Sequence, residues 1–239
     1  DVAQIFKGMS GQYYPVGVEV DVLDDMASLL PTDHAAARIL WTGDYENRFL
    51  ILYKIYNDVY FSDDGGATSV RVGPAGLYGT IHWGLVVPNK SIVLYTVSDL
   101  GDRQIWVSNT FTDASTENWT LKLTMPVDAG PNPTWGRSNY GDVIAFITYG
   151  SYNASNPPRY LYITRDAGTT WKTVEVTKIE DMVNPANFHL HDVEYDPWMG
   201  RIWVSFGDER EQTGVKYSDD WGDTWTEILG PSSGQPTNI

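Results

Sequence analysis

The sequence repeats one short pattern three times after strand-like segments, and this repeat constrains the fold more than any other feature. In each copy a hydroxyl residue, an aspartate, a glycine and a threonine occupy alternate positions. A degraded fourth copy begins at Ser108 and keeps its strand and Trp119. The four copies start 46, 56 and 54 residues apart, which is the spacing of repeated β units. The clean copies are Ser62-x-Asp64-x-Gly66-x-Thr68, Thr164-x-Asp166-x-Gly168-x-Thr170 and Ser218-x-Asp220-x-Gly222-x-Thr224.

The residue types of the pattern predict a hairpin turn whose polar groups are satisfied locally. A Ser or Thr that closes a strand, and an Asp two residues later, can both bond to nearby backbone N–H groups. The glycine supplies a positive φ that other residues resist, and the threonine returns the chain to β geometry. Trp171 and Trp225 directly follow the last two copies. We expect their indoles to fill gaps between neighbouring sheets.

Each repeat also contains strand-like segments on both sides of the turn. Two alternating or apolar segments precede the strand that ends at the hydroxyl residue, and another β-rich segment follows the turn. Four short antiparallel strands in 40–55 residues are the signature of a propeller blade. The sequence therefore predicts an all-β chain, a β-propeller of four-stranded antiparallel blades over 33–230. The remaining segments are an N-terminal leader or closing strand over 1–32, with a short helix at 21–30, and a tail over 231–239.

The blades of a propeller form a ring, and the number of blades in this chain raises the question of how the ring closes. Four repeats are recognisable, and the leader is too short for a fifth blade. An open arc of blades would expose two apolar sheet faces. We therefore expect a larger parent chain, or a homo-oligomer, to complete the ring in preference to a free four-bladed monomer.

Composition excludes several classes of partner. The formal net charge is −15, so the surface repels phosphate backbones, and we expect no nucleic-acid partner. No apolar run is long enough to cross a bilayer, so we expect no membrane insertion. The chain has no cysteine, which excludes disulfides and thiolate sites. We expect no cofactor, with Ca²⁺ on the carboxylate-rich loops as the open alternative.

The three turns resemble the Asp boxes, or BNR repeats, of sialidase-like β-propellers, including phage tail and secreted bacterial members. In that family the boxes lie on the outer rim and occur in proteins of many functions. Sialidases use three arginines, a Tyr–Glu pair and an Asp acid/base, and the resemblance implies only weak counterparts here. Arg38, in Ala37-Arg38-Ile39-Leu40, lacks the aromatic residue and the proline of the family motif, and no third arginine is placed. The candidate catalytic residues are Arg38, Arg137 and Asp192, and Asp44, Glu194 and Asp208 are further carboxylates near inner strand ends.

Histidine and tryptophan supply the candidate ligand-binding residues. His34, His82 and His189 fall at the start of the first strand of repeats one, two and four. His191 lies two residues after His189, and Trp135-Gly136-Arg137 takes the equivalent place in repeat three. They predict a ring of side chains around one mouth of the central channel, with packing inside or between blades as the alternative. His189, His191 and Asp208 are the residues to test for a metal, because His-x-His on a strand can place two ligands on one face. The predicted ligand-binding residues are His34, His82, Trp83, Trp135, Arg137, His189 and His191.

Three functions remain open on this sequence. The first is an extracellular or virion-surface propeller that recognises a glycan or cell surface, because exposed indoles stack on sugar rings and the chain is rich in Trp and Tyr. The second is a sialidase-type glycoside hydrolase. The third is a propeller that acts as a structural scaffold in an assembly.

Overall fold

The computed structural model describes residues 36–41, 49–53, 58–62, 70–72, 80–87, 91–98, 100–108, 119–125, 136–147, 159–207 and 212–229. The predicted leader, the helix at 21–30 and the tail lie outside these residues. So do His34, Asp44, Asp64, Gly66, Thr68, Trp135 and Asp208. The structure gives the backbone alone for Arg38, Ser62 and His82.

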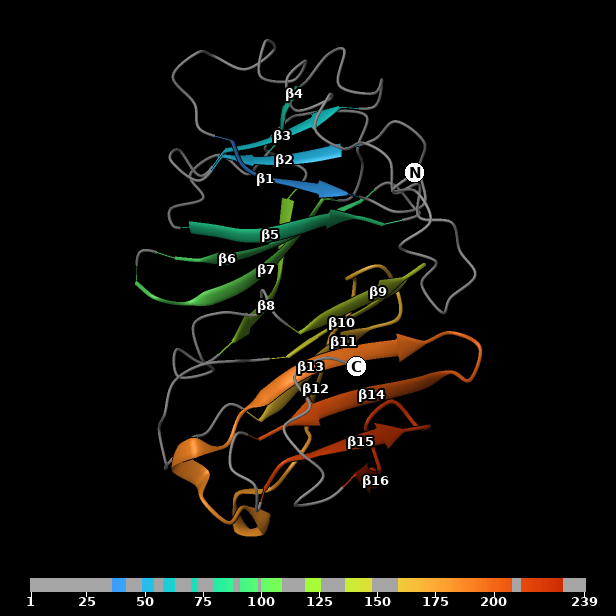
Figure 1. Cartoon of the computed structure of the whole chain (residues 1–239). Coiled ribbons are helices and arrows are strands. Elements are labelled where there is room, and N and C mark those ends of the chain that lie inside the picture. The colour runs from blue at the N-terminus through green and yellow to red at the C-terminus, as the bar shows by residue number, and fades with distance from the viewer. Residues whose placement is uncertain are drawn as a thin grey trace, which may run out of the picture. The chain divides into compact units, whose positions relative to one another are not determined.

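Sixteen strands of the described chain form four antiparallel sheets, each of four strands that pair in chain order (Figure 1). This arrangement confirms the predicted repeat unit of four strands. The strands of the first two sheets are β1 (Ala36–Trp41), β2 (Phe49–Tyr53), β3 (Asp58–Ser62) and β4 (Val70–Val72), then β5 (Thr80–Val86), β6 (Ile92–Val97), β7 (Arg103–Ser108) and β8 (Trp119–Met125). Those of the last two are β9 (Arg137–Tyr140), β10 (Val143–Ile147), β11 (Tyr160–Thr164) and β12 (Lys172–Glu175), then β13 (Leu190–Asp196), β14 (Arg201–Phe206), β15 (Gly214–Ser218) and β16 (Thr226–Leu229).

The first strand of three sheets carries an irregularity in its register at the same place. The pairing shifts between Ala36 and Arg38 in β1, between Ile81 and Trp83 in β5, and between Leu190 and Asp192 in β13. One extra residue at such a bulge breaks the strict alternation of side chains. His82 and His191 are therefore the equivalent bulge residues, whereas the sequence had aligned His82 with His189.

The chain divides into two compact units, residues 1–121 and 122–239, and the boundary runs through β8. In the first unit, β6 is buried along most of its length, including Tyr95, and Trp83 of β5 and Ile105 of β7 are buried in the strands on either side. In the second unit, β13 packs against β9 and β10 of the preceding sheet. The core between these sheets includes Ile147, Val174 and Val204. Two short 3₁₀ helices, η3 (Ile179–Asp181) and η4 (Pro185–Asn187), connect the sheets. No helix among the described residues is long and apolar enough to span a membrane.

Candidate functional site

The side chains of Thr164 and Asp166 bond within their own turn, 164–170. The Thr164 hydroxyl donates to the Asp166 carboxylate at 2.7 Å and accepts the backbone N–H groups of Asp166 and Gly168 at 3.3 and 3.0 Å. The Asp166 carboxylate also accepts the backbone N–H and the hydroxyl of Thr170, at 2.8 and 2.6 Å. The predicted local hydrogen bonding is confirmed for this copy.

The turn 218–224 repeats the same arrangement one sheet later. Ser218 donates to Asp220 at 2.7 Å and accepts the Gly222 N–H at 2.7 Å. Asp220 in turn accepts the backbone N–H and the hydroxyl of Thr224, at 2.8 and 2.5 Å. These bonds hold the pKa of Asp220 at about 2, below its ordinary 3.8, with the Thr224 side chain as the largest contributor.

Both turns require positive φ at two successive residues, whereas the sequence predicted it for the glycine alone. Gly168 and Gly222 have φ of 85° and 87°, and the preceding Ala167 and Trp221 have φ of 56° and 61°. A bulky residue such as Trp rarely adopts this left-handed conformation. Strained residues of this kind cluster at functional sites, so the residues around Trp221 are candidates for such a site.

The tryptophans that end the two turns pack differently. The Trp171 indole donates to the Gly168 carbonyl at 2.9 Å and lies edge-on to Phe146 of its own sheet, 5.5 Å between ring centroids. Trp225 packs against the core between the last two sheets, which confirms the predicted gap filling for this residue. Its indole N–H has no hydrogen-bond partner among the described residues.

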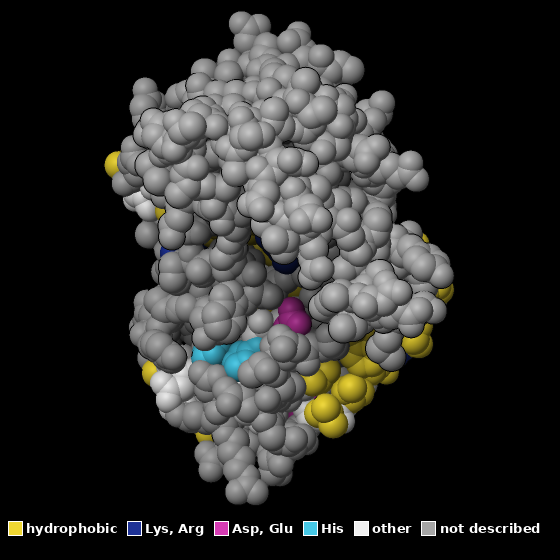
Figure 2. All heavy atoms as spheres, turned by 45° about the horizontal axis from the view of Figure 1, so that its top comes forward, with side chains coloured by type: hydrophobic (Ala, Val, Ile, Leu, Met, Phe, Trp, Pro, Cys, Tyr) yellow, Lys and Arg dark blue, Asp and Glu magenta, His cyan; other side chains and the backbone are white. Residues whose placement is uncertain are grey.

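Two of the predicted ligand-binding histidines lie together. The rings of His189 and His191 stack in parallel at 4.7 Å between centroids, so the expected common face is observed. They are the only histidines whose side chains the structure describes, and histidine atoms reach the surface in Figure 2 (cyan). Their exposed fractions are nevertheless only 3% and 8%. Within the described residues, no group of three potential metal ligands forms, and Asp208 lies outside them.

Trp83 is a core side chain and no longer a candidate for ligand binding. Its exposed fraction is 0%, and its indole stacks on Tyr95 at 5.8 Å between ring centroids. This burial agrees with the alternative that Trp83 fills space within the fold. The bulge before Trp83 explains why alternation along β5 did not reveal its orientation.

The remaining candidates of the second unit lie on its adjacent first strands, β9 and β13. Arg137 begins β9, and both Arg137 and Asp192 are partly exposed. Ser138 connects the two strands, because its hydroxyl accepts the Tyr195 N–H at 3.0 Å and donates to the Glu194 carboxylate. Glu194 is an exposed residue, yet desolvation of its carboxyl group raises its pKa. The Ser138 bond opposes this rise, and the charges of Asp192 and Asp196 add to it.

Replacing Ser138 by alanine tests this link between strands. The change leaves the Tyr195 N–H without its acceptor, so we expect the free energy of unfolding to fall by about 1–3 kcal/mol. The pKa of Glu194 should rise further, because the bond that lowers it is lost. Urea unfolding and an NMR titration of Glu194 measure the two effects. Asn139→Ala, at the exposed neighbouring position, is the control, and an unchanged Glu194 titration in Ser138→Ala would contradict the link.

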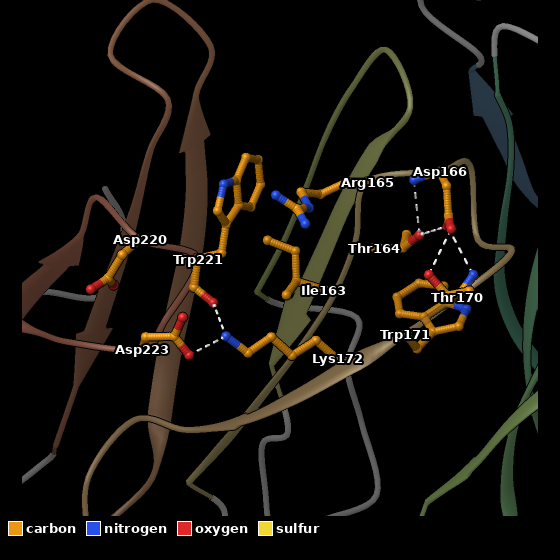
Figure 3. A pocket seen from close by; sticks show the side chains of 10 residues that line it. All are labelled: Ile163, Thr164, Arg165, Asp166, Thr170, Trp171, Lys172, Asp220, Trp221 and Asp223. Carbon is orange, nitrogen blue, oxygen red and sulfur yellow. Dashed lines mark hydrogen bonds and ion pairs between the residues drawn. The ribbon is translucent and has the colours of Figure 1, made fainter.

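An open groove lies between the turns 164–170 and 218–224. Its volume is about 460 Å³, and ten side chains from both turns and the adjacent strands line it (Figure 3). The Trp221 indole forms part of its wall, and its ring centroid lies 5.4 Å from that of Tyr195 and 4.8 Å from the Arg165 guanidinium. Lys172 reaches across the groove to the Trp221 carbonyl at 3.0 Å and to Asp223 at 2.6 Å.

An exposed indole lies on the hairpin between β13 and β14. Trp198 is 62% exposed, and its neighbour Met199 is 57% exposed. The backbone of this turn is fixed, because the Asp196 carboxylate accepts the N–H groups of Trp198 and Met199 at 2.9 and 3.2 Å. An indole held on a fixed turn is a flat apolar surface available to a ligand.

Sequence reasoning missed the groove because its distinctive residues occupy variable positions of the repeat. Arg165 and Trp221 are x residues of the pattern, and the resemblance to Asp boxes implies only a place on the outer rim for both. One signal was present: a tryptophan directly precedes the glycine in only one of the three clean copies. Such a side chain at a position of positive φ is uncommon enough to mark a site.

Comparison with solved structures identifies the fold. YCF48 bound to a D1 peptide aligns with a TM-score of 0.51 and 15% identity over 84% of this chain and 54% of that chain. The GH74 xyloglucanase from Xanthomonas campestris aligns with a TM-score of 0.52 and 16% identity, over 82% of this chain and 30% of that chain. The chain folds as a β-propeller. It spans about half the length of the YCF48 chain.

The sequence comparisons give no narrower assignment for this propeller. No family model matches the sequence, and no curated protein matches it significantly. The resemblance to Asp-box and sialidase-like proteins therefore stays a prediction. Identities of 15% and 16% establish the fold of the chain and leave its activity open.

Proposed function

We propose that this β-propeller recognises glycans on a cell or virion surface, without catalysing their hydrolysis. The observation that carries the proposal is the exposed indole of Trp198 on its fixed turn. The apolar face of a pyranose ring matches an aromatic plane, and a rigid platform binds it with little loss of conformational entropy. Hydrogen-bonding groups that suit a sugar also line the groove beside Trp221.

The printed names of the structural neighbours support recognition in general. One neighbour is a xyloglucanase, and another was solved with a bound peptide. The propeller fold therefore serves ligands of both classes, and the surface residues of this chain must decide between them. The high Trp and Tyr content favours the glycan. We place the protein outside the cell or on a virion, as the resemblance to secreted and phage tail proteins suggests.

Replacing Trp198 by alanine tests the proposal. We expect the wild-type chain to bind a subset of a glycan array, and Trp198→Ala to weaken that binding at least about tenfold. Tenfold corresponds to about 1.4 kcal/mol, within what burial of a large aromatic side chain contributes. Titration calorimetry with the best array ligand gives the ratio of affinities.

Met199→Ala is the matched control, because Met199 is equally exposed on the same turn and lacks a ring. We expect this control to bind like the wild type. Equal losses in both variants would contradict stacking on Trp198. Turnover of a fluorogenic sialoside, abolished by Arg38→Ala, would favour the hydrolase. A stable homo-oligomer without any glycan ligand would favour the scaffold.

A further inference from the structure

The groove between the two repeat turns contains one cation that forms no ion pair with the residues that the structure describes. Arg165 is exposed and rests on the Trp221 indole, 4.8 Å from its centroid. No carboxylate of the described residues forms an ion pair with it. This is notable in a chain with 31 acidic and 16 basic residues.

The other charged groups of the groove are committed to internal contacts. Lys172 pairs with Asp223 at 2.6 Å. The carboxylates of Asp166 and Asp220 each accept three hydrogen bonds from their own turns. In Figure 3 these two carboxylates lie at opposite sides of the view, whereas the Arg165 guanidinium extends towards Trp221 between them. Among the described residues that line the groove, Arg165 is thus the one charged side chain without an ion pair or a hydrogen bond within its own turn.

The Trp221 indole, over which Arg165 lies, is itself held in place. Trp221 is fixed in a left-handed conformation with φ of 61°, and Tyr195 stacks on its indole at 5.4 Å. A guanidinium stacked on an aromatic plane keeps its N–H groups at the edge, where they can bind a carboxylate in a bidentate manner. Preorganisation of this kind lowers the entropy cost of binding.

We infer that the groove binds the carboxylate of an acidic sugar through Arg165. This inference rests on the proposed function and names the class of glycan. A carboxylate completes the unpaired guanidinium, and sugar hydroxyls can donate to the lone pairs that Asp166 and Asp223 retain. An acidic peptide side chain supplies the carboxylate without these hydroxyl donors, so the mixed groove favours the sugar.

The net charge of −15 repels an anionic ligand only weakly, because salt screens those charges that lie farther from the groove than the screening length of the solution. At physiological ionic strength the Debye length is about 8 Å, so charges elsewhere on the exposed surface are largely screened. The contact between the guanidinium and the carboxylate is short-ranged, and charge-assisted hydrogen bonds are about twice as strong as neutral ones. Contact with Arg165 therefore outweighs the long-range repulsion.

The test compares trigalacturonate with its methyl ester, which keeps the rings and removes the charge. In titration calorimetry at 0.15 M salt, we expect the full wild-type chain to bind the acid at least about tenfold more tightly than the ester. Arg165→Gln should reduce this ratio to about one. Lys178→Gln removes an exposed cation outside the groove and should keep the wild-type ratio. In the wild type, the acid should also shift the Trp221 indole N–H resonance.

Several results would overturn the inference: failure of the wild type to bind the acid, equal binding of acid and ester, an unchanged ratio in Arg165→Gln, or tighter binding of triglutamate than of trigalacturonate. The proposed function is judged separately. It survives these results if neutral glycans still bind in a manner that depends on Trp198, and it fails if Trp198→Ala binds every array ligand like the wild type.

Discussion

Replacing Gly222 by alanine is expected to lower the free energy of unfolding by about 2–4 kcal/mol, because two costs add at this position. The φ of Gly222 is 87°, which disfavours any residue with a Cβ atom. The new Cβ would also lie 2.6 and 2.9 Å from the two methyl carbons of Val174, a buried residue of the preceding sheet. Urea unfolding of the full chain, followed by tryptophan fluorescence, measures the loss.

Gly200→Ala separates these two costs. Gly200 has a φ of 65°, but an added Cβ there would meet nothing within 4 Å. We expect this control to lose only the backbone contribution, about 1–2 kcal/mol. If both variants lost the same free energy, contact between the turn 218–224 and Val174 would contribute nothing, and the described packing between sheets would be wrong at this point.

Replacing Asp220 by asparagine is expected to lower the melting temperature by several degrees at neutral pH. The amide cannot accept all three hydrogen bonds of the turn as the charged carboxylate does. The difference from the wild type should shrink in acid. Because the folded pKa of about 2 lies below the ordinary 3.8, the contribution of the carboxylate is complete above about pH 5 and is lost progressively as the pH falls towards 2.

Calorimetric melting curves between pH 7 and 2 measure this dependence. Asp181→Asn is the control, since Asp181 is an exposed carboxylate outside the repeat turns. We expect it to change the melting temperature less than Asp220→Asn does at neutral pH. A gap between wild type and Asp220→Asn that stayed constant down to pH 2 would show that the charge of Asp220 does not stabilise the turn.

The strands and the repeat turns could be predicted from the sequence because their causes are local. Alternating segments such as 58–62 and 214–218 form the third strand of their sheets, and the hydroxyl, Asp and Gly positions of 164–170 and 218–224 make the expected bonds. Each interaction joins residues within seven positions of the chain. Short-range spacing is sufficient information for such a feature.

The candidate site depended on contacts that the sequence does not encode locally. Arg165 meets Trp221 only because two sheets pack with one particular register. Trp83 is buried because a bulge alters the alternation of side chains along β5, and the residue types of that strand do not predict a bulge. The exposure of Trp198, by contrast, agrees with its position at a tight turn. Its side chain could be placed from the sequence, although its role could not.

The local hydrogen bonds of the repeat turns bear on how the number of repeats can change during evolution. The hydrogen bonds of the Thr164 hydroxyl and the Asp166 carboxylate join residues of the same turn, 164–170. A duplicated or deleted copy would therefore carry these bonds with it, whereas the bonds from Lys172 to the Trp221 carbonyl and to Asp223 join neighbouring repeats. After such an event, the new neighbouring sheets must also form complementary apolar contacts, such as the close approach of Gly222 to Val174. Gain or loss of a whole repeat should therefore disturb the bonds within the turns little and the packing between adjacent sheets most.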